Sequence, residues 1–388
     1  MNKKEVNEIR RILEKNDCRI DRMCGCYIDE KGELITELTD SFHSLADEEL
    51  FRYCEIFRKT LSGRIGRTLL NLSFPLQEEK EGGRAEKLQA LLRSGLQDPE
   101  RIRSFFGEVT ETLRMSEKYL LLLAHGIYDI PGRTTDGAAL RDSSDYVYSF
   151  LLLSVCPVKL LRDGLCYDSE EQTFLSRTEN WGVQMPETGF LYPAFNDRST
   201  DLHAALWYAK NEKSRHEELA AGLLGIELPR GESAERDVFR EIVEQSLGAD
   251  CSYESVRNVN DAVNKIVEEE KEAGEQAYLD GGSLAAILTE SGAAPEAAER
   301  ARETYQKVVG SGAEPILADN VAAPKTLSVK SDHMKLEVLS EASELIETRE
   351  IDGMEYFLIP VADNVTVNGI RIRRRRGSGE NAGEKAAE

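Results

Sequence analysis

The chain has 388 residues, of which 40% are hydrophobic, and this is enough apolar material to bury the cores of two or three domains. Cysteine, proline and glycine are each near ordinary usage, which excludes collagen-like, disulfide-scaffold and wholly disordered proteins. The formal net charge of −22 disfavours non-specific adsorption to DNA or anionic lipid, although a local basic patch can still bind nucleic acid.

The sequence predicts a cytoplasmic protein that does not enter a membrane. Its longest mostly apolar run, 146–158, is shorter than the ~20 residues that a membrane-spanning helix needs. The first residues are charged, and no apolar segment of the signal-peptide kind follows them. We expect the scattered cysteines to be reduced thiols, and they are Cys18, Cys24, Cys26, Cys54, Cys156, Cys166 and Cys251.

Helical and strand patterns alternate up to about residue 211. The predicted elements are, in chain order, a helix at 5–13, a hairpin of 18–28 and 32–38, a helix that opens with a capping box at Ser44 and ends near Gly63, a strand at 67–74, and helices within 76–116 with a new start at Asp98-Pro99. Two nearly continuous apolar segments follow, at 119–128 and 146–158. Strands of this kind are usually covered on both faces, so we expect them at the centre of a sheet.

The next part of the chain holds the densest cluster of reactive side chains. We expect 169–185 to be irregular, 189–195 to be a strand and 201–210 to be a helix, with Ser199 or Thr200 as its N-cap. The candidate catalytic residues lie between this strand and the start of the helix, and they are Asp197, Arg198, Asp201 and His203.

Two interpretations of this cluster are open. A strand that leads into a helix N-terminus is a natural anion site. One of the aspartates would then form an acid/base pair with His203, and Arg198 would hold the anionic group. In the structural alternative, the hydroxyl residues cap the helix, Asp201 complements its dipole, and Arg198 pairs with a nearby acid.

The second half of the chain changes in character twice. From 212 to 310 the pattern is helical and acidic, with 22 acidic against 11 basic residues. Strand patterns return beyond 314, with hairpins predicted around Asp352-Gly353 and Asn368-Gly369. We therefore predict an α+β protein. Its expected parts are an α/β domain at 1–211, an acidic helical domain at 212–312, a small β-hairpin unit at 313–376 and a disordered tail at 377–388.

Positive charge is concentrated at two places. Arg64 and Arg67 belong to a Gly-x-x-Gly loop, which is either a clamp for a nucleic-acid backbone or an ordinary helix-to-strand connector. The densest basic run follows the last predicted hairpin and consists of Arg371, Arg373, Arg374, Arg375 and Arg376. This run would bind phosphate or an acidic partner, or else it pairs with the chain's own acidic helices or extends into solvent.

Short enzyme motifs are missing from the sequence. There is no P-loop, no complete dinucleotide-binding glycine motif, no His-Glu-x-x-His and no Gly-x-Ser-x-Gly. The four N-terminal cysteines would suit zinc chemically but lack the spacing of a ribbon or finger, so we expect them to pack in the core. We expect neither a metal nor a cofactor.

A family resemblance is carried by the segments 1–11, 25–33, 61–63, 189–200, 352–361 and 367–369. In these segments the chain resembles a family of bacterial proteins defined only as a domain of unknown function. The resemblance spans nearly the whole chain and implies no activity. The order of elements, with 283–288 and the hairpin region beyond His333, is also similar to that of the 37-kilodalton nucleoid-associated proteins.

The leading hypothesis is a non-enzymatic cytosolic binding protein that meets nucleic acid or a nucleoid component through its basic patches. One alternative is an enzyme, or a small-anion-binding protein, that uses the cluster at 197–203. The other is a protein–protein scaffold whose acidic helices form the contact face. The sequence leaves the substrate, the partner and the oligomeric state open.

Overall fold

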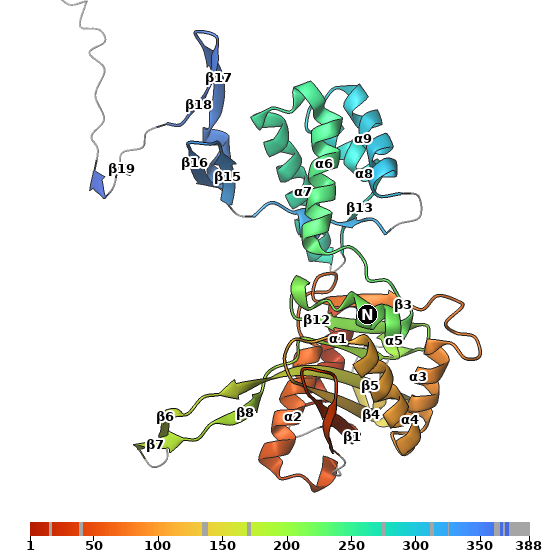
Figure 1. Cartoon of the computed structure of the whole chain (residues 1–388). Helices are drawn as coiled ribbons and strands as arrows, with labels where there is room; N and C mark the ends of the chain where they lie inside the picture. The colour runs from red at the N-terminus through yellow and green to blue at the C-terminus, as the bar shows by residue number, and fades with distance from the viewer. Residues whose placement is uncertain are drawn as a thin grey trace, which may run out of the picture. The chain divides into compact units, whose positions relative to one another are not determined.

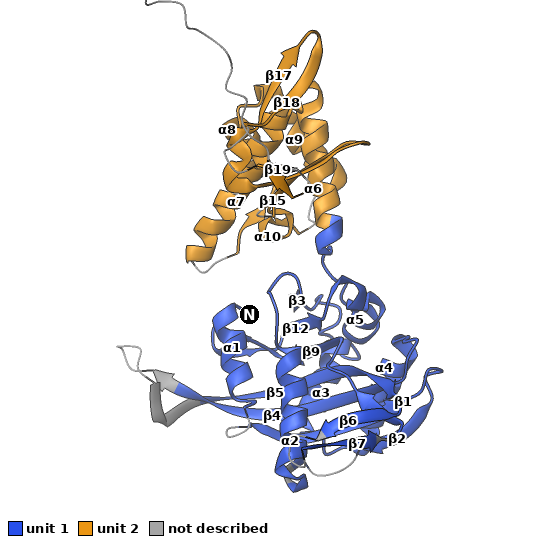
Figure 2. Cartoon of the chain, turned by 90° about the vertical axis from the view of Figure 1, so that its left-hand side faces the viewer, with its two compact units in different colours: residues 1–234 blue, residues 235–388 orange. Residues whose placement is uncertain are grey.

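The computed structural model describes residues 1–14, 18–38, 42–133, 139–168, 172–273, 276–310, 314–324, 326–360, 365–367 and 369–371. The chain divides into two compact units, Met1–Ala234 and Glu235–Glu388, which have different colours in Figure 2. Helices and antiparallel strands are both abundant, which confirms the α+β class. None of the described helices is long and apolar enough to cross a membrane.

Helices and strands alternate along the first unit. Its helices are α1 (Lys3–Arg11), α2 (Asp47–Thr60), α3 (Arg84–Arg93), α4 (Pro99–Thr112) and α5 (Glu217–Leu224). Its strands are β1 (Ile20–Ile28), β2 (Leu34–Leu38), β3 (Leu69–Ser73), β4 (Tyr119–Arg133), β5 (Ala139–Leu161), β6 (Gly164–Asp168), β7 (Thr173–Arg177), β8 (Asn180–Val183), β9 (Thr188–Tyr192), β10 (Ala194–Asn196), β11 (Ser199–Asp201) and β12 (Ala204–Ala209).

An antiparallel sheet forms the middle layer of this unit (Figure 1). In the described residues its strand order is β2-β1-β4-β5-β9-β12-β3, and β8 pairs with the far end of β5. Helices α3, α4 and α5 pack on one face of the sheet, and α1 and α2 pack on the other. The long pair β4–β5 lies in the middle of the sheet, which confirms the prediction for the two most apolar segments.

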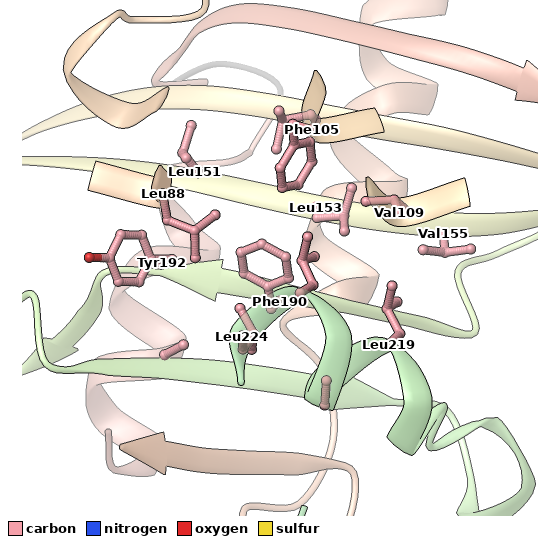
Figure 3. Packing of buried hydrophobic residues seen from close by; sticks show 14 of the residues in the cluster. Leu88, Phe105, Val109, Leu151, Leu153, Val155, Phe190, Tyr192, Leu219 and Leu224 are labelled. Atoms are coloured by element: carbon pink, nitrogen blue, oxygen red, sulfur yellow. The ribbon is translucent and has the colours of Figure 1, made fainter. Parts of the chain in front are cut away.

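Both faces of the central strands are buried. In β4, Leu121 and Leu123 point into the core under α3, α4 and α5, whereas Leu120 and Leu122 point into the core under α1 and α2. Figure 3 shows the first of these cores, in which Phe190 of β9 lies among side chains from β5, α3 and α5. A strand covered on both faces needs an unbroken apolar sequence, which is why these segments show no alternation.

The helix predicted at 201–210 is wrong, because β12 occupies this part of the chain. This strand lies between β9 and β3, and all six of its residues are buried. A short, wholly apolar run has no periodicity that separates a buried strand from a buried helix. The irregular segment predicted at 169–185 is also wrong, since its described part contains β7 and β8.

Helix starts were predicted with mixed success. Asp98 caps α4 as expected, and its carboxylate accepts the backbone N–H groups of Glu100 and Arg101. The capping box at Ser44 is wrong, because the N-cap of α2 is Ala46 and Ser44 lies in a short 3-10 helix before it. The acidic first turn of α2 still complements its helix dipole.

The second unit is a helical bundle followed by small hairpins. Its helices are α6 (Glu232–Leu247, of which residues 232–234 belong to the first unit), α7 (Tyr253–Ala273), α8 (Gly281–Glu290), α9 (Pro295–Val308) and α10 (Ala318–Val321). Its strands are β13 (Tyr278–Leu279), β14 (Ile316–Leu317), β15 (Thr326–Lys330), β16 (Lys335–Leu339), β17 (Glu347–Ile351), β18 (Met354–Leu358), β19 (Thr366–Val367) and β20 (Ile370–Arg371). Its core joins α6, α7, α8 and α9 and includes Val259, Val263 and Val267 of α7.

Both predicted C-terminal hairpins are confirmed. β17 pairs with β18 across a turn in which Asp352 and Gly353 have φ values of 55° and 76°, the left-handed region that this two-residue turn requires. β19 pairs antiparallel with β20, with Val367 opposite Ile370. Asn368 of the second turn and the predicted tail at 377–388 lie outside the described residues.

Candidate functional site

The cluster at 197–203 forms a tight hairpin, and the helix N-terminus expected there is absent. β10 and β11 pair across a two-residue turn made by Asp197 and Arg198, whose φ values are 50° and 54°. Positive φ at both turn positions matches the twist of the flanking strands. The physical basis for an anion site at this point, a helix N-terminus, is therefore missing.

Arg198 is held by helix α1. Its Nε and one terminal nitrogen lie 2.8–3.2 Å from the carboxylate oxygens of Glu8, so the contact is bidentate. The hydroxyl of Tyr128 donates to the same carboxylate at 2.9 Å. The hydrogen bond to Glu8 raises the pKa of Arg198, and burial raises the pKa of Tyr128 to about 12. These contacts match the structural alternative, in which Arg198 pairs with a nearby acid.

The hairpin turn is also tied to the start of α1. The backbone N–H of Asp197 donates to one carboxylate oxygen of Glu5 at 2.8 Å. The other oxygen of Glu5 accepts the backbone N–H of Asn2, the N-cap of α1, at 2.6 Å. A single carboxylate thus joins the capping box of the helix to the turn.

The side chains of Asp201 and His203 have different hydrogen-bond partners. The carboxylate of Asp201 accepts the side-chain amide of Asn196 at 2.7 Å and the backbone N–H of His203 at 3.0 Å. The ring of the exposed His203 contacts Glu79, with 2.8 Å between Nδ1 and Oε1. This hydrogen bond raises the pKa of His203. The ring partner of His203 is therefore Glu79, and neither predicted aspartate takes that place.

The Gly-x-x-Gly loop uses its backbone donors internally. The N–H of Arg64 donates to the Thr68 hydroxyl, and the N–H groups of Gly66 and Arg67 donate to carbonyls within the loop. The side chain of Arg67 pairs with Glu232, whereas that of Arg64 is exposed. These contacts are those of a connector between α2 and β3, and they leave Arg64 as the accessible positive charge of the loop.

The C-terminal arginine run is described only at its first member. Arg371 is exposed at the end of β20. The other four, Arg373, Arg374, Arg375 and Arg376, lie outside the described residues.

The N-terminal cysteines do not gather into a metal site. Among the described residues, no group of three or more His, Cys, Asp or Glu side chains is arranged to hold a metal ion. Burial raises the pKa of the Cys24 and Cys26 thiols to about 12, so both stay protonated at neutral pH. Cys54 lies close to Cys18, with 3.2 Å between their sulfur atoms.

A cavity of about 590 Å³ lies at the open end of β1, between β2 and the first turns of α4. Asp21 and Glu37 line it together with Arg22 and Arg103, and the last of these lies 3.4 Å from Glu37. Next to Asp21 is the buried ring of His125, whose Nδ1 lies 3.4 Å from a carboxylate oxygen of Asp21 and whose pKa is lowered by burial. The lining thus holds two acidic and two basic residues, and its formal net charge is zero.

A two-stranded ribbon, which the sequence did not predict, extends from the sheet (Figure 1). It starts where β5 pairs with β8 and continues as the hairpin of β6 and β7. The register is constant along its length, from Val158 opposite Val183 to Asp168 opposite Thr173. We call residues 158–183 the arm. Among the described residues, β6 and β7 pair only with each other.

One face of the arm is apolar and solvent-exposed. Tyr167 and Phe174 lie opposite each other, with ring centroids 5.3 Å apart in an edge-to-face arrangement. Leu165 is on the same face, two residues before Tyr167, because side chains alternate along a strand. The exposed fractions are 75% for Leu165, 58% for Tyr167 and 67% for Phe174. Apolar residues at the alternate positions 165 and 167 indicate one apolar face of a strand. Nothing in the sequence indicates that the rest of the chain leaves this face uncovered.

Comparison with known proteins gives a family without an assigned activity. No curated protein matches the chain, so the similarity of layout to nucleoid-associated proteins stays a prediction. A family described as a domain of unknown function, DUF4317, matches residues 1–370, which confirms the resemblance carried by the sequence segments. The chain belongs to the DUF4317 family.

Proposed function

We propose that this protein is a non-enzymatic binding protein that contacts a partner protein through the arm. The observation that carries this proposal is the exposed apolar face of Leu165, Tyr167 and Phe174. Single exposed apolar residues are ordinary on protein surfaces, but contiguous apolar patches are typical of interaction sites. Aromatic side chains are also enriched where protein interfaces bind most tightly.

The energy available at this face is large enough to hold a complex together. Fully burying a large apolar side chain contributes about 1.5–3 kcal/mol, so covering the exposed parts of these three contributes on the order of 5 kcal/mol. Association itself costs several kcal/mol, so a stable complex needs further contacts. The outer edges of β6 and β7 can supply them, because an extended strand of a partner can add to an open edge through backbone hydrogen bonds.

The charge of the arm defines the partner that fits it. Residues 158–183 hold five acidic and three basic side chains, and the whole chain carries −22. This balance disfavours nucleic acid, anionic membrane and a second copy of the chain as occupants of the arm. The partner that complements it is a protein with an apolar surface or strand bordered by lysine and arginine.

A reducing, cytoplasmic location is part of the proposal. It is supported by seven cysteines that form no disulfide.

Nucleic acid is a second candidate partner, at a different surface. It is favoured by the exposed Arg371 and by the run of arginines that continues to Arg376 in the sequence. The exposed Arg64 can add to this charge, whereas Arg67 is engaged by Glu232.

Co-purification from the native host separates these candidates. An arm variant carries Leu165→Ser, Tyr167→Ser and Phe174→Ser, and a control variant carries Leu34→Ser and Ile35→Ser on β2, where the exposed fractions are 53% and 49%. Tagged full-length proteins are isolated at low and high salt, with and without nuclease.

The arm proposal predicts a protein that accompanies the wild type and the control variant through nuclease treatment and is absent from the arm variant. Nucleic acid that leaves at high salt or after nuclease supports the second candidate instead. Identical protein partners on the wild type and the arm variant contradict the arm proposal.

A further inference from the structure

Two cysteines from separate elements meet in the first unit. Cys18 lies in the segment that leads into β1 and is half-buried, and Cys54 lies in the middle of α2 with 1% of its surface exposed. The thiol of Cys54 donates to the sulfur of Cys18 at an Sγ–Sγ distance of 3.2 Å. The two side chains point at each other although they are 36 positions apart in the sequence.

This arrangement is close to that of a disulfide. The sulfur atoms of a disulfide are about 2.05 Å apart, so these two need to approach by about 1.2 Å. Cys18 lies outside any helix or strand, and a small adjustment of its side chain and of the local backbone can supply that movement. Cys54 can keep its place in α2.

Two arginines and one glutamate lie around the pair, and the carboxylate of Glu14 is 3.6 Å from the guanidinium of Arg58. The hydrogen bond with Cys18 and burial raise the pKa of the Cys54 thiol, whereas the charge of Arg58, one helical turn away on α2, lowers it. Arg10 of α1 is near enough to Arg58 for the two charges to repel each other. The Nε atoms of both arginines are buried without a hydrogen-bond partner in the described structure. Positive charge beside a thiol favours the reactive thiolate.

We propose that Cys18 and Cys54 are an oxidisable pair that low-molecular-weight disulfides, such as glutathione disulfide, convert into an intramolecular disulfide. In the first step, the Cys18 thiolate attacks one sulfur of glutathione disulfide, whose S–S bond breaks and releases one glutathione. In the second step, the Cys54 thiolate attacks the Cys18 sulfur of the mixed disulfide and releases the second glutathione. The protein loses two electrons and two protons, and the oxidant gains them as two glutathione thiols.

The order of the two steps follows from burial. Cys18 is the accessible thiol, so it meets the oxidant first. Cys54 is shielded from solvent, so it reacts second, with the sulfur of Cys18 that its own thiol already faces. Both steps need a thiolate, so the rate of closure rises with pH.

The same chain provides internal controls. Cys251 is exposed and Cys166 is half-buried, so both can take up glutathione as single thiols. Cys24 and Cys26, with pKa values raised to about 12, resist the same reagent. An oxidised sample therefore distinguishes closure of the pair from general reactivity of cysteine.

The test is peptide mapping of the full-length protein. The protein is incubated with glutathione disulfide, its free thiols are alkylated, and its peptides are analysed by mass spectrometry without reduction. The proposal predicts a peptide that links Cys18 to Cys54 and forms faster as the pH rises, while Cys251 carries glutathione. Glutathione on Cys251 without the linked peptide overturns the proposal, and so does a mixed disulfide that persists on Cys18.

Thermal unfolding adds a second readout with matched variants. Oxidation should raise the unfolding temperature of the wild type and of Cys251→Ser, because a cross-link restricts the unfolded chain. The variant Cys18→Ser should show no such rise, and a reducing agent should reverse the rise in the other two proteins. Equal shifts in Cys18→Ser and the wild type contradict the proposal.

Discussion

The ion pair between Arg198 and Glu8 is the contact that separates a structural from a catalytic role for the hairpin at 197–203. We would replace each residue by glutamine, singly and together, as Arg198→Gln, Glu8→Gln and the double variant. Glutamine keeps a polar side chain that can still form a hydrogen bond, so the double-mutant cycle isolates the part of the free energy that depends on both charges.

The burial and the geometry of the ion pair determine how much unfolding free energy we expect each substitution to remove. The side chains of Arg198 and Glu8 are 23% and 22% exposed, so water screens their interaction only partly. A hydrogen bond between charged groups contributes about 1.5–3 kcal/mol, and this contact is bidentate. We therefore expect Arg198→Gln to lower the free energy of unfolding by about 2 kcal/mol, with a coupling free energy of about 1.5 kcal/mol.

Urea unfolding followed by tryptophan fluorescence measures these values. Trp181 and Trp207 are the two tryptophans of the chain and both lie in the first unit, so the signal reports the unit that contains the ion pair. A coupling below about 0.5 kcal/mol, the level expected of independent sites, would refute the structural role.

Three further predictions concern pH, packing and domain extent. In an NMR titration, the pKa of His203 should lie above the ordinary histidine value of 6.5 and that of His125 below it. The stability that His203 contributes is then present below pH 6.5 and is lost as the pH rises through its folded pKa. The stability that His125 contributes is present above pH 6.5 and is lost as the pH falls through its folded pKa. Gly189→Ala should lower the free energy of unfolding by more than ~2 kcal/mol, because the added methyl group would collide with a backbone carbonyl of β5; a smaller loss in urea unfolding would count against this packing. A fragment of 1–211, the extent proposed for the first domain, should unfold at a lower temperature than 1–234, since α5 packs on the sheet; equal unfolding temperatures would argue against that packing.

Much of the local structure could be predicted from residues whose chemistry fixes it. Asp352 and Gly353 can both adopt the left-handed conformation that a two-residue hairpin turn requires. Pro99 after Asp98 marked the start of α4, because a proline in the first turn leaves no donor unsatisfied there. The continuous apolar run at 119–128 indicated a strand buried on both faces.

The misses have a common physical origin in tertiary context. The apolar run at 204–209 fits a buried helix as well as a buried strand, and only its neighbours β9 and β3 decide between them. Because a helix was predicted there, the segment before it was interpreted as a helix N-terminus, and the predicted anion site depended on that N-terminus. The alternative pairing of Arg198 with an acid was predicted in kind, but its partner Glu8 is 190 positions away in the sequence.

The arm could not have been found as a site from the sequence. Leu165 and Phe174 are of residue types that are usually buried in a core. They are exposed because no other described part of the chain covers them. Polar residues at 169–171 interrupt the pattern between the two strands.

Photo-crosslinking can show directly whether the arm contacts a partner protein. Benzoylphenylalanine replaces Phe174 in the full-length protein in its own host, and the same probe at Ile35 of β2 serves as the control, since both positions are exposed. We expect crosslinks from position 174, absent from position 35, to apolar partner peptides that carry lysine or arginine. Crosslinks from position 174 only to nucleic acid or to a second copy of the chain, or an equal yield from both positions, would contradict this expectation.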